Sequence, residues 1–466
     1  MSILKRSLSL TLTFATSSTL AQIDIPKVVY GADNRVEVYE AAPALQAVAA
    51  STAAMIPIAR LKLNVDETSD LRTYTALQTK LKDNGICADD RFADQPVPGM
   101  CSGFLVGPDL LITAGHCART LTSCQSNAWV FGFAVDGATH TAGLNIPADS
   151  VYRCKELVNQ KLNSLEGTDH ALIRLDRVVT GVAPLKVRTE GKIEDATDIV
   201  VIGHPMGLPT KVADGAKVRT NSHPHYFVAN LDTFGGNSGS VVVNNNDLMV
   251  EGILVRGETD YKFNAQKGCQ EVFQCEDDKC RGEDVTRITD VIELTQREAV
   301  LNAAQTGDAA LIAEYLKKKG WVNIYDNAGV TMLARAAQGQ QAQITNELIV
   351  AKADVSLSDL KGRTPLHFLA SNAALSVEGE SVLETLIGAG VKLDAQETEG
   401  LDTALHLAVK SRNVRLVELL LKAGASPKLL NAAKKAPIDL TDWFNPKHRK
   451  IRSLLKKALA GKTNRK

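Results

Sequence analysis

The pattern of apolar positions changes its period near residue 292 of this 466-residue chain. From about residue 59 to residue 290, short apolar runs such as 102–107 and 198–205 are separated by turn residues. Runs of this kind, joined by irregular connections, predict an all-β barrel or sandwich. Beyond residue 292 the apolar positions recur at helical spacing, for example in 310–318. This spacing predicts a helical second half.

The helical half contains an internal repeat. Its equivalent positions, separated by 33, 39 and 33 residues, are Thr331, Thr364, Thr403 and Ala436. A period of 33 residues with T-P-L-H-like openings is typical of ankyrin repeats. This half therefore resembles an ankyrin-repeat domain of four or five units over residues 295–460. His367 and His406 occupy the histidine position of the motif, and we expect them to bond the backbone of a neighbouring turn rather than to act in catalysis.

The N-terminus has the pattern of an export signal. Lys5 and Arg6 precede an uncharged run that ends in small residues, with a plausible cleavage site after Ala21. No later segment reaches the roughly 20 apolar residues that a membrane helix needs. We therefore expect a signal peptide over residues 1–21, no membrane span, and a soluble mature protein that is secreted or periplasmic.

Cysteine usage and charge limit the classes of function. All eight cysteines lie before residue 281, and an even number in an exported region suggests disulfides. No Cys/His grouping has zinc-finger spacing, and no other metal, nucleotide or haem motif occurs, so no metal and no cofactor are expected. The 53 basic and 53 acidic residues balance, so no binding to nucleic acid is expected. The basic tail, residues 461–466, is interpreted as a solvated terminus.

Ser238, within the segment DTFGGNSGS, is the candidate nucleophile. A serine hydroxyl is a weak nucleophile until a base removes its proton, and that base works best when a carboxylate orients it. Upstream, LLITAGHCA contains His116 just past an apolar strand, and GTDHALIRLD contains Asp169 at the start of another. An α/β-hydrolase is excluded because its G-x-S-x-G elbow requires a glycine where Ser240 stands.

These three segments resemble the chymotrypsin-like (trypsin-fold) serine peptidases, whose motifs occur here as TAGHC, DHALIRL and GNSG in the family's order. The resemblance covers about residues 28–294. It implies a catalytic triad of His116, Asp169 and Ser238. The expected fold is therefore multidomain, an all-β double-barrel trypsin-like domain followed by an all-α ankyrin-repeat solenoid.

The resemblance also implies two features around the nucleophile. It assigns the oxyanion hole to the backbone N–H groups of Gly236 and Ser238. It further implies a disulfide between Cys101 and Cys117, next to the catalytic histidine.

Two features depart from trypsin and chymotrypsin. Asn237 stands where those enzymes carry an aspartate that pairs with the new N-terminal amine, and an amide cannot form that ion pair. The segments GGNSGS and VVYGADNR are similar instead to the bacterial glutamyl-endopeptidase-like branch. This similarity predicts an N-terminal segment or propeptide over residues 22–58, with a mature peptidase that starts at Val28 after cleavage behind Lys27. The main peptidase domain is then expected at residues 59–294.

Substrate preference depends on Asp232, which lies six residues before Ser238, where trypsin-like members carry the acid of the primary specificity pocket. In that position it favours Arg or Lys before the scissile bond. Alternatively, it caps the loop and pairs with Arg256. Because the glutamyl branch carries a histidine where this chain has Leu254, no preference for Glu is expected. The expected substrate-binding residues are Asp232, Thr233, Leu254 and Val255.

Two functions from different classes follow from these motifs. The first is an exported serine-type endopeptidase that hydrolyses peptide bonds through an acyl-enzyme. Its partners are a protein or peptide substrate and an unidentified protein bound by the ankyrin repeats. The alternative is a catalytically inactive, peptidase-fold binding protein that works through its ankyrin surface. A third possibility, inhibition in cis by the repeats, predicts that deletion of residues 296–466 raises activity.

Overall fold

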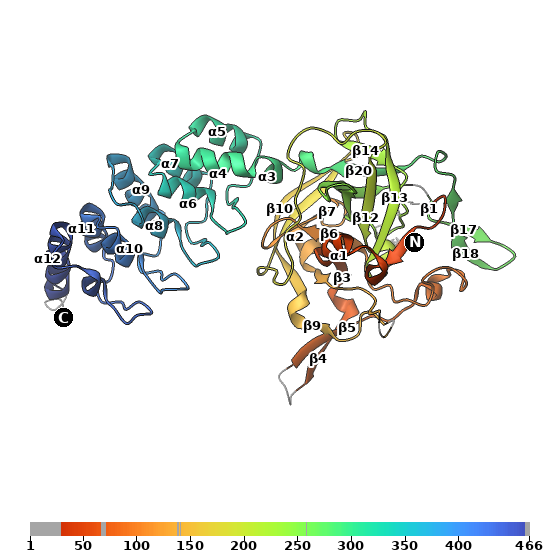
Figure 1. Ribbon diagram of the computed structural model, residues 1–466, viewed down its shortest axis with the longest axis horizontal. Coiled ribbons are helices and arrows are strands. Elements are labelled where there is room, and N and C mark those ends of the chain that lie inside the picture. Colours follow the sequence, from red (N-terminus) through yellow and green to blue (C-terminus); the bar gives the residue numbers. More distant parts are fainter. Residues whose placement is uncertain (1–28, 67–70, 138, 140, 258, 462–466) are drawn as a thin grey trace, which may run out of the picture.

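The computed structural model describes residues 29–66, 71–137, 139, 141–257 and 259–461. The expected signal peptide and the expected cleavage site behind Lys27 lie outside these residues. Figure 1 shows a β-rich body and a row of helices that extends from one side of it. The predicted fold class is confirmed, because two six-stranded barrels are followed by a helical region with ankyrin repeats. Among the described helices, none combines the length and the apolar character that crossing a membrane requires.

The first barrel consists of six antiparallel strands in the closed order β10-β11-β7-β6-β3-β8. These strands are β3 (Thr52–Pro57), β6 (Cys101–Leu105), β7 (Leu110–Thr113), β8 (Asn127–Phe131), β10 (Val151–Asn163) and β11 (Thr168–Leu175). Large apolar side chains such as Phe104 and Trp129 are fully buried in its core. Strand β3 begins at Thr52. The barrel therefore begins before residue 59, where the main peptidase domain was expected to start.

The second barrel has the order β12-β15-β16-β20-β14-β13 and is closed by pairing of β12 with β13. Its strands are β12 (Asp198–Gly203), β13 (Lys211–Thr220), β14 (Tyr226–Ala229), β15 (Val241–Asn244), β16 (Val250–Arg256) and β20 (Glu283–Arg287). Strand β2 (Arg35–Glu37) pairs with β13. The Nζ atom of Lys211 lies 3.0 Å from Oε2 of Glu37, and both side chains are buried. The described part of residues 22–58 is therefore built into the barrels rather than set apart from them.

The helical half is a stack of antiparallel helix pairs. The pairs are α4 (Arg297–Thr306) with α5 (Ala309–Lys317), α6 (Met332–Gln338) with α7 (Ala342–Val350), α8 (Pro365–Ala370) with α9 (Val377–Gly388), and α10 (Ala404–Lys410) with α11 (Val414–Ala423). The stack ends with α12 (Pro446–Gly461), which packs against α11. Each unit buries apolar residues against the next one, as expected for a solenoid.

The two histidines of the repeat motif have the structural role that was predicted. Nδ1 of His367 accepts from the backbone N–H of Thr364 at 3.1 Å, and Nε2 lies 3.1 Å from the carbonyl oxygen of Asp402 in the next unit. His406 makes the same contacts with Thr403 and with the carbonyl oxygen of Lys435. These side chains therefore link adjacent repeats.

The first repeat is joined to the first barrel by polar contacts that are buried or partly buried. Trp321 Nε1 donates to Glu156 on β10 at 3.0 Å, and the hydroxyl of Tyr325 donates to Asp109. Asp109 also accepts from Arg174 Nε on β11 at 3.1 Å. One continuous apolar core extends from the barrel into the repeats. The joint is therefore a packed interface rather than a linker.

Replacement of Trp321 by alanine is expected to lower the free energy of unfolding by about 3–5 kcal/mol, the usual cost of removing a buried large side chain. Trp321 is 7% exposed, and the substitution also removes its bond to Glu156. Trp443, which is 63% exposed, provides the matched control, and Trp443→Ala should change stability by about 0.5 kcal/mol or less. Urea unfolding measures both variants, and equal effects would contradict a packed joint.

Candidate active site

His116 and Asp169 are brought together by the pairing of β7 with β11. His116 follows β7 by three residues, Asp169 is the second residue of β11, and Thr113 lies opposite Ala171 in the antiparallel register. The Nδ1 atom of His116 lies 2.8 Å from Oδ2 of Asp169, and the backbone N–H of His116 donates to Oδ1 at 3.0 Å. The carboxylate therefore fixes both the main chain and the ring of the histidine. With the Nδ1 proton directed at Asp169, Nε2 is left as the proton acceptor.

A close backbone approach at Gly115 positions His116. A Cβ atom at Gly115 would lie 2.3 Å from the carbonyl oxygen of Lys161 and 3.1 Å from Oδ1 of Asp169. Only glycine fits such a gap without displacing backbone. The third residue of TAGHC therefore allows the histidine loop to lie directly against β10 and β11.

Ser238 lies in the loop between β14 and β15 and contacts the histidine loop. The carbonyl oxygen of Ser238 accepts from the backbone N–H of Ser102 at 2.8 Å and lies 3.7 Å from Sγ of Cys117, the residue after His116. Cys117 forms a disulfide with Cys101 on β6. The structure thus brings Ser238 and the His116–Asp169 pair to the same junction between the two barrels.

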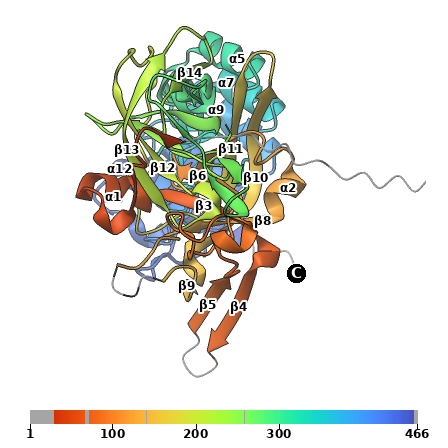
Figure 2. The ribbon, with the colours of Figure 1, turned by 90° about the vertical axis from the view of Figure 1, so that its right-hand side faces the viewer.

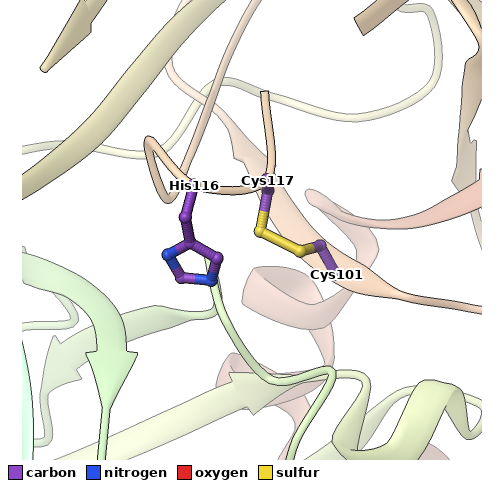
Figure 3. A group of neighbouring side chains, drawn as sticks. All are labelled: Cys101, His116 and Cys117. Carbon is purple, nitrogen blue, oxygen red and sulfur yellow. A yellow bond between two sulfur atoms is a disulfide. The ribbon is translucent and has the colours of Figure 1, made fainter. Parts of the chain in front are cut away.

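Figure 3 shows His116 beside the disulfide of Cys101 and Cys117. The ligand atoms of these three residues lie within 4.8 Å of one another, a spacing that suits a metal site. Zinc binds cysteine as a thiolate. Since both sulfur atoms are joined in the disulfide, this group is not a metal-binding set, and the disulfide instead fastens the histidine loop to β6.

The turn before Ser238 requires glycine at position 236. Gly236 has a φ of +86°, and a Cβ atom there would lie 2.8 Å from the backbone nitrogen of Gly207. No described residue accepts a hydrogen bond from the N–H of Gly236, so this donor is available to a bound group. Asn237 accepts from Ser240 Oγ at 3.0 Å, so its side chain stabilises the turn.

Asp232 binds the N-terminal segment of the described chain. Its Oδ1 accepts from the N–H of Tyr30 at 2.7 Å, and its Oδ2 accepts from the N–H of Asn34 at 2.9 Å. The expected pairing with Arg256 is wrong, because Arg256 binds Asp284 at 3.1 Å. Burial raises the pKa of Asp232 to about 6 despite these two bonds. Asp232 therefore caps a loop, as one alternative predicted. The groups that it binds are backbone N–H groups 202 and 198 residues earlier in the sequence.

The other expected substrate-binding residues surround the same loop. Thr233 Oγ1 donates to Glu283 Oε2 at 2.8 Å, and both side chains are buried. Leu254 exchanges backbone bonds with Gly239 and Ser240, at 2.8 and 3.0 Å. The side chains of Leu254 and Val255 are fully buried. The side chains of Thr233, Leu254 and Val255 therefore lie in the interior, and the backbone of Leu254 holds the loop of Ser238 in place.

The sequence interpretation missed Arg35. This residue is 1% exposed, binds Asp33, and places its guanidinium carbon 4.1 Å from the ring centre of Phe234, four residues before Ser238. An arginine stacked on an aromatic face gains a cation–π attraction that burial strengthens. In the sequence, ADNR has the composition of an exposed turn, so no local signal indicates this contact.

Comparisons with known families agree with this architecture. A family model described as a trypsin-like peptidase domain matches residues 101–253, and one described as ankyrin repeats (3 copies) matches residues 334–431. The chain combines a trypsin-like peptidase domain with ankyrin repeats. The matched peptidase segment contains His116, Asp169 and Ser238.

Similar curated proteins cover only part of the chain. The chain is 37% identical over 90 residues to BRCA1-associated RING domain protein 1 of Caenorhabditis elegans, with 19% of this chain and 12% of that protein covered. It is 34% identical over 125 residues to nuclear factor NF-kappa-B p105 subunit of Gallus gallus, with 26% and 12% covered. It is also 31% identical over 137 residues to poly [ADP-ribose] polymerase tankyrase of Caenorhabditis elegans, with 24% and 6% covered. The chain thus spans a small fraction of each relative, and none of the three is named as a peptidase.

The raised pKa of Asp232 predicts a pH dependence of stability. Because the folded pKa of about 6 lies above the ordinary value of 3.8, the folded chain holds a proton between about pH 4 and pH 6 that the unfolded chain has released. The contribution of Asp232 to stability therefore falls as pH rises through this window, by on the order of 1–3 kcal/mol.

Asp232→Asn removes the titrating group, so this part of the pH dependence should disappear. Urea unfolding at about pH 4, 5 and 7 measures it. Asp198→Asn, a substitution at a half-exposed carboxylate, should leave the pH dependence close to that of the wild type. Unchanged pH dependence in Asp232→Asn would contradict the assignment.

Proposed function

We propose that the chain is an exported serine endopeptidase that cleaves peptide bonds through an acyl-enzyme. The observation that carries the proposal is the bond of 2.8 Å between His116 Nδ1 and Asp169, formed at the junction where the loop of Ser238 contacts Cys117. An oriented histidine with an acceptor nitrogen beside a serine is the arrangement that activates a hydroxyl.

The proposed steps follow from the geometry of these groups. Ser238 Oγ attacks the carbonyl carbon of the scissile bond while His116 Nε2 takes its proton. His116 then returns this proton to the leaving amine, and Asp169 stabilises the imidazolium that exists in between. The backbone N–H groups of Gly236 and Ser238 donate to the oxyanion of the tetrahedral intermediate. Water then attacks the acyl carbonyl carbon while His116 Nε2 takes a proton from it. His116 returns this proton to Ser238 Oγ as the bond to the acyl group breaks and the carboxylic acid leaves.

The proposed activity includes no preference for Arg or Lys before the scissile bond. Both oxygens of Asp232 accept from the backbone of residues 30 and 34, so its charge is engaged within the protein. The similarity to the bacterial glutamyl-endopeptidase-like branch stays part of the proposal and rests on GGNSGS and VVYGADNR.

Export is supported by the cysteines. The eight cysteines form four disulfides, Cys87–Cys269, Cys101–Cys117, Cys124–Cys154 and Cys275–Cys280. Such bonds persist in oxidising compartments, which agrees with the export signal in the sequence. We therefore propose a secreted or periplasmic location.

We propose that the ankyrin repeats bind a protein partner. Ankyrin stacks present an extended concave surface for this purpose. The repeats contact β11 where Arg174 lies against the ring of Tyr325, five residues after Asp169, or about 17 Å along an extended strand. This contact is at the opposite end of β11 from Asp169, which favours recruitment over inhibition in cis.

An activated Ser238 should react with a fluorophosphonate probe. Wild-type protein that lacks the first 27 residues is expected to be labelled, and Ser238→Ala and His116→Ala are expected to abolish labelling, because one removes the nucleophile and the other its base. Asp169→Asn should lower the turnover of peptides by on the order of 10⁴-fold. Ser222→Ala, at an exposed serine, should retain labelling. An unlabelled wild type would favour the alternative of an inactive binding protein.

A further inference from the structure

A small sheet lies outside both barrels and ends in an open edge. Strands β4 (Leu61–Asp66), β5 (Leu71–Ala76) and β9 (Ile146–Pro147) form it in the order β4-β5-β9. Figures 1 and 2 show β4 and β5 projecting beyond the body of the molecule. Among the described residues, β4 pairs with β5 alone, so its other side is an unpaired strand edge.

The register of the hairpin determines which backbone groups face that edge. Leu61 lies opposite Ala76, and one step earlier in the same register the N–H of Leu77 donates to the carbonyl oxygen of Arg60 at 2.8 Å. Bonded and non-bonded pairs alternate along an antiparallel ladder. The N–H and C=O groups of Leu61, Leu63 and Val65 therefore point outward, away from β5.

The edge of β4 is only partly protected, because the strand has no proline and its pairing with β5 has no bulge. Leu63 and Val65 are 47% and 52% exposed and share one face of the strand. Charged side chains also protect natural edges, but those of β4 have opposite signs. On the opposite face, exposed Lys62 and exposed Asp66 stand at equal distances from Asn64. Lys62 and Asp66 are therefore placed symmetrically about Asn64 and carry opposite charges.

We propose that β4 pairs with β4 of a second copy of this chain, antiparallel, with the two-fold axis at Asn64. Lys62 then lies opposite Asp66 of the second copy, twice by symmetry. Leu63 lies opposite Val65 of the second copy, and this pair exchanges both of its outward backbone bonds. Opposite charges and apolar pairs directly across a ladder each stabilise it. The interface is isologous, as a two-fold dimer requires, and it does not depend on the proposed peptidase activity.

Other symmetric registers lose this complementarity. An axis at Leu63 places Lys62 opposite Asn64, and an axis at Lys62 places the two lysines against each other. An axis between two residues pairs an outward backbone group with an inward one, so no ladder forms. Only the axis at Asn64 matches both charged positions of β4.

A ladder of five residues from each copy, 62–66, buries less surface than a standard interface, so the dimer should dissociate on dilution. We expect sedimentation velocity of the mature chain to show a growing dimer fraction between about 1 and 100 µM. A wild-type chain that stays monomeric over this range would overturn the proposal.

Charge exchange tests the register. Lys62→Asp and Asp66→Lys each place like charges across the ladder, and each should lower the dimer fraction at least several-fold. The double variant Lys62→Asp/Asp66→Lys restores opposite charges and should restore the dimer. Lys186→Asp, at an exposed lysine outside this sheet, is the control for net charge. A dimer that persists in both single variants, or a double variant that stays monomeric, would refute the pairing.

A cysteine at the axis provides a second readout. In the proposed register the two Asn64 residues form a non-bonded pair with Cα atoms about 4.5 Å apart, within the range of a disulfide. Asn64→Cys should therefore give a covalent dimer under mild oxidation. Lys62→Cys should not, because it faces Asp66 of the second copy. Equal cross-linking of both variants would indicate random collision and would contradict the two-fold axis.

Discussion

The antiparallel pairing of β7 with β11 is the interaction on which the candidate site depends. It places Asp169 at the start of one strand beside His116, just past the end of the other. Asp169 then accepts from both the backbone and the ring of His116, so the histidine has one orientation and one tautomer. The same strand carries Arg174, which reaches Asp109 at the joint with the repeats. A single element thus contributes to the candidate site at one end and contacts the ankyrin stack at the other.

The two halves are stabilised by different means. All four disulfides lie in the peptidase half, where irregular loops between strands leave much chain to be fixed. In the ankyrin half each helix pair is stabilised by its neighbours, with His367 and His406 linking successive turns. The first repeat belongs to both systems, because it shares one apolar core with the first barrel. The joint therefore anchors the beginning of the stack on the first barrel.

The sequence predicted those features that have a local pattern. The ankyrin repeats follow from the recurring T-P-L-H-like openings, and the double barrel follows from short motifs such as TAGHC. The partner of Asp232 could not be predicted, because Tyr30 is 202 residues distant and contributes only a backbone N–H, which any residue type carries. The start of the first barrel was placed too late for a related reason. Strand β3 follows an Ala-rich helix, α1 (Pro43–Ala50), and its own alanines are weak indicators of a strand.

The bonds to Asp232 also bear on how the Ser238 loop is ordered. In trypsin-like enzymes, as the resemblance implies, an aspartate next to the serine pairs with a newly formed ammonium group. Here Asn237 bonds within its own turn, and Asp232 accepts from amide groups in the interior of the chain. Amide donors exist whether or not the chain is cut behind Lys27. These contacts therefore hold the N-terminal segment against the loop without a terminal charge, and a cleavage there is not needed to form them.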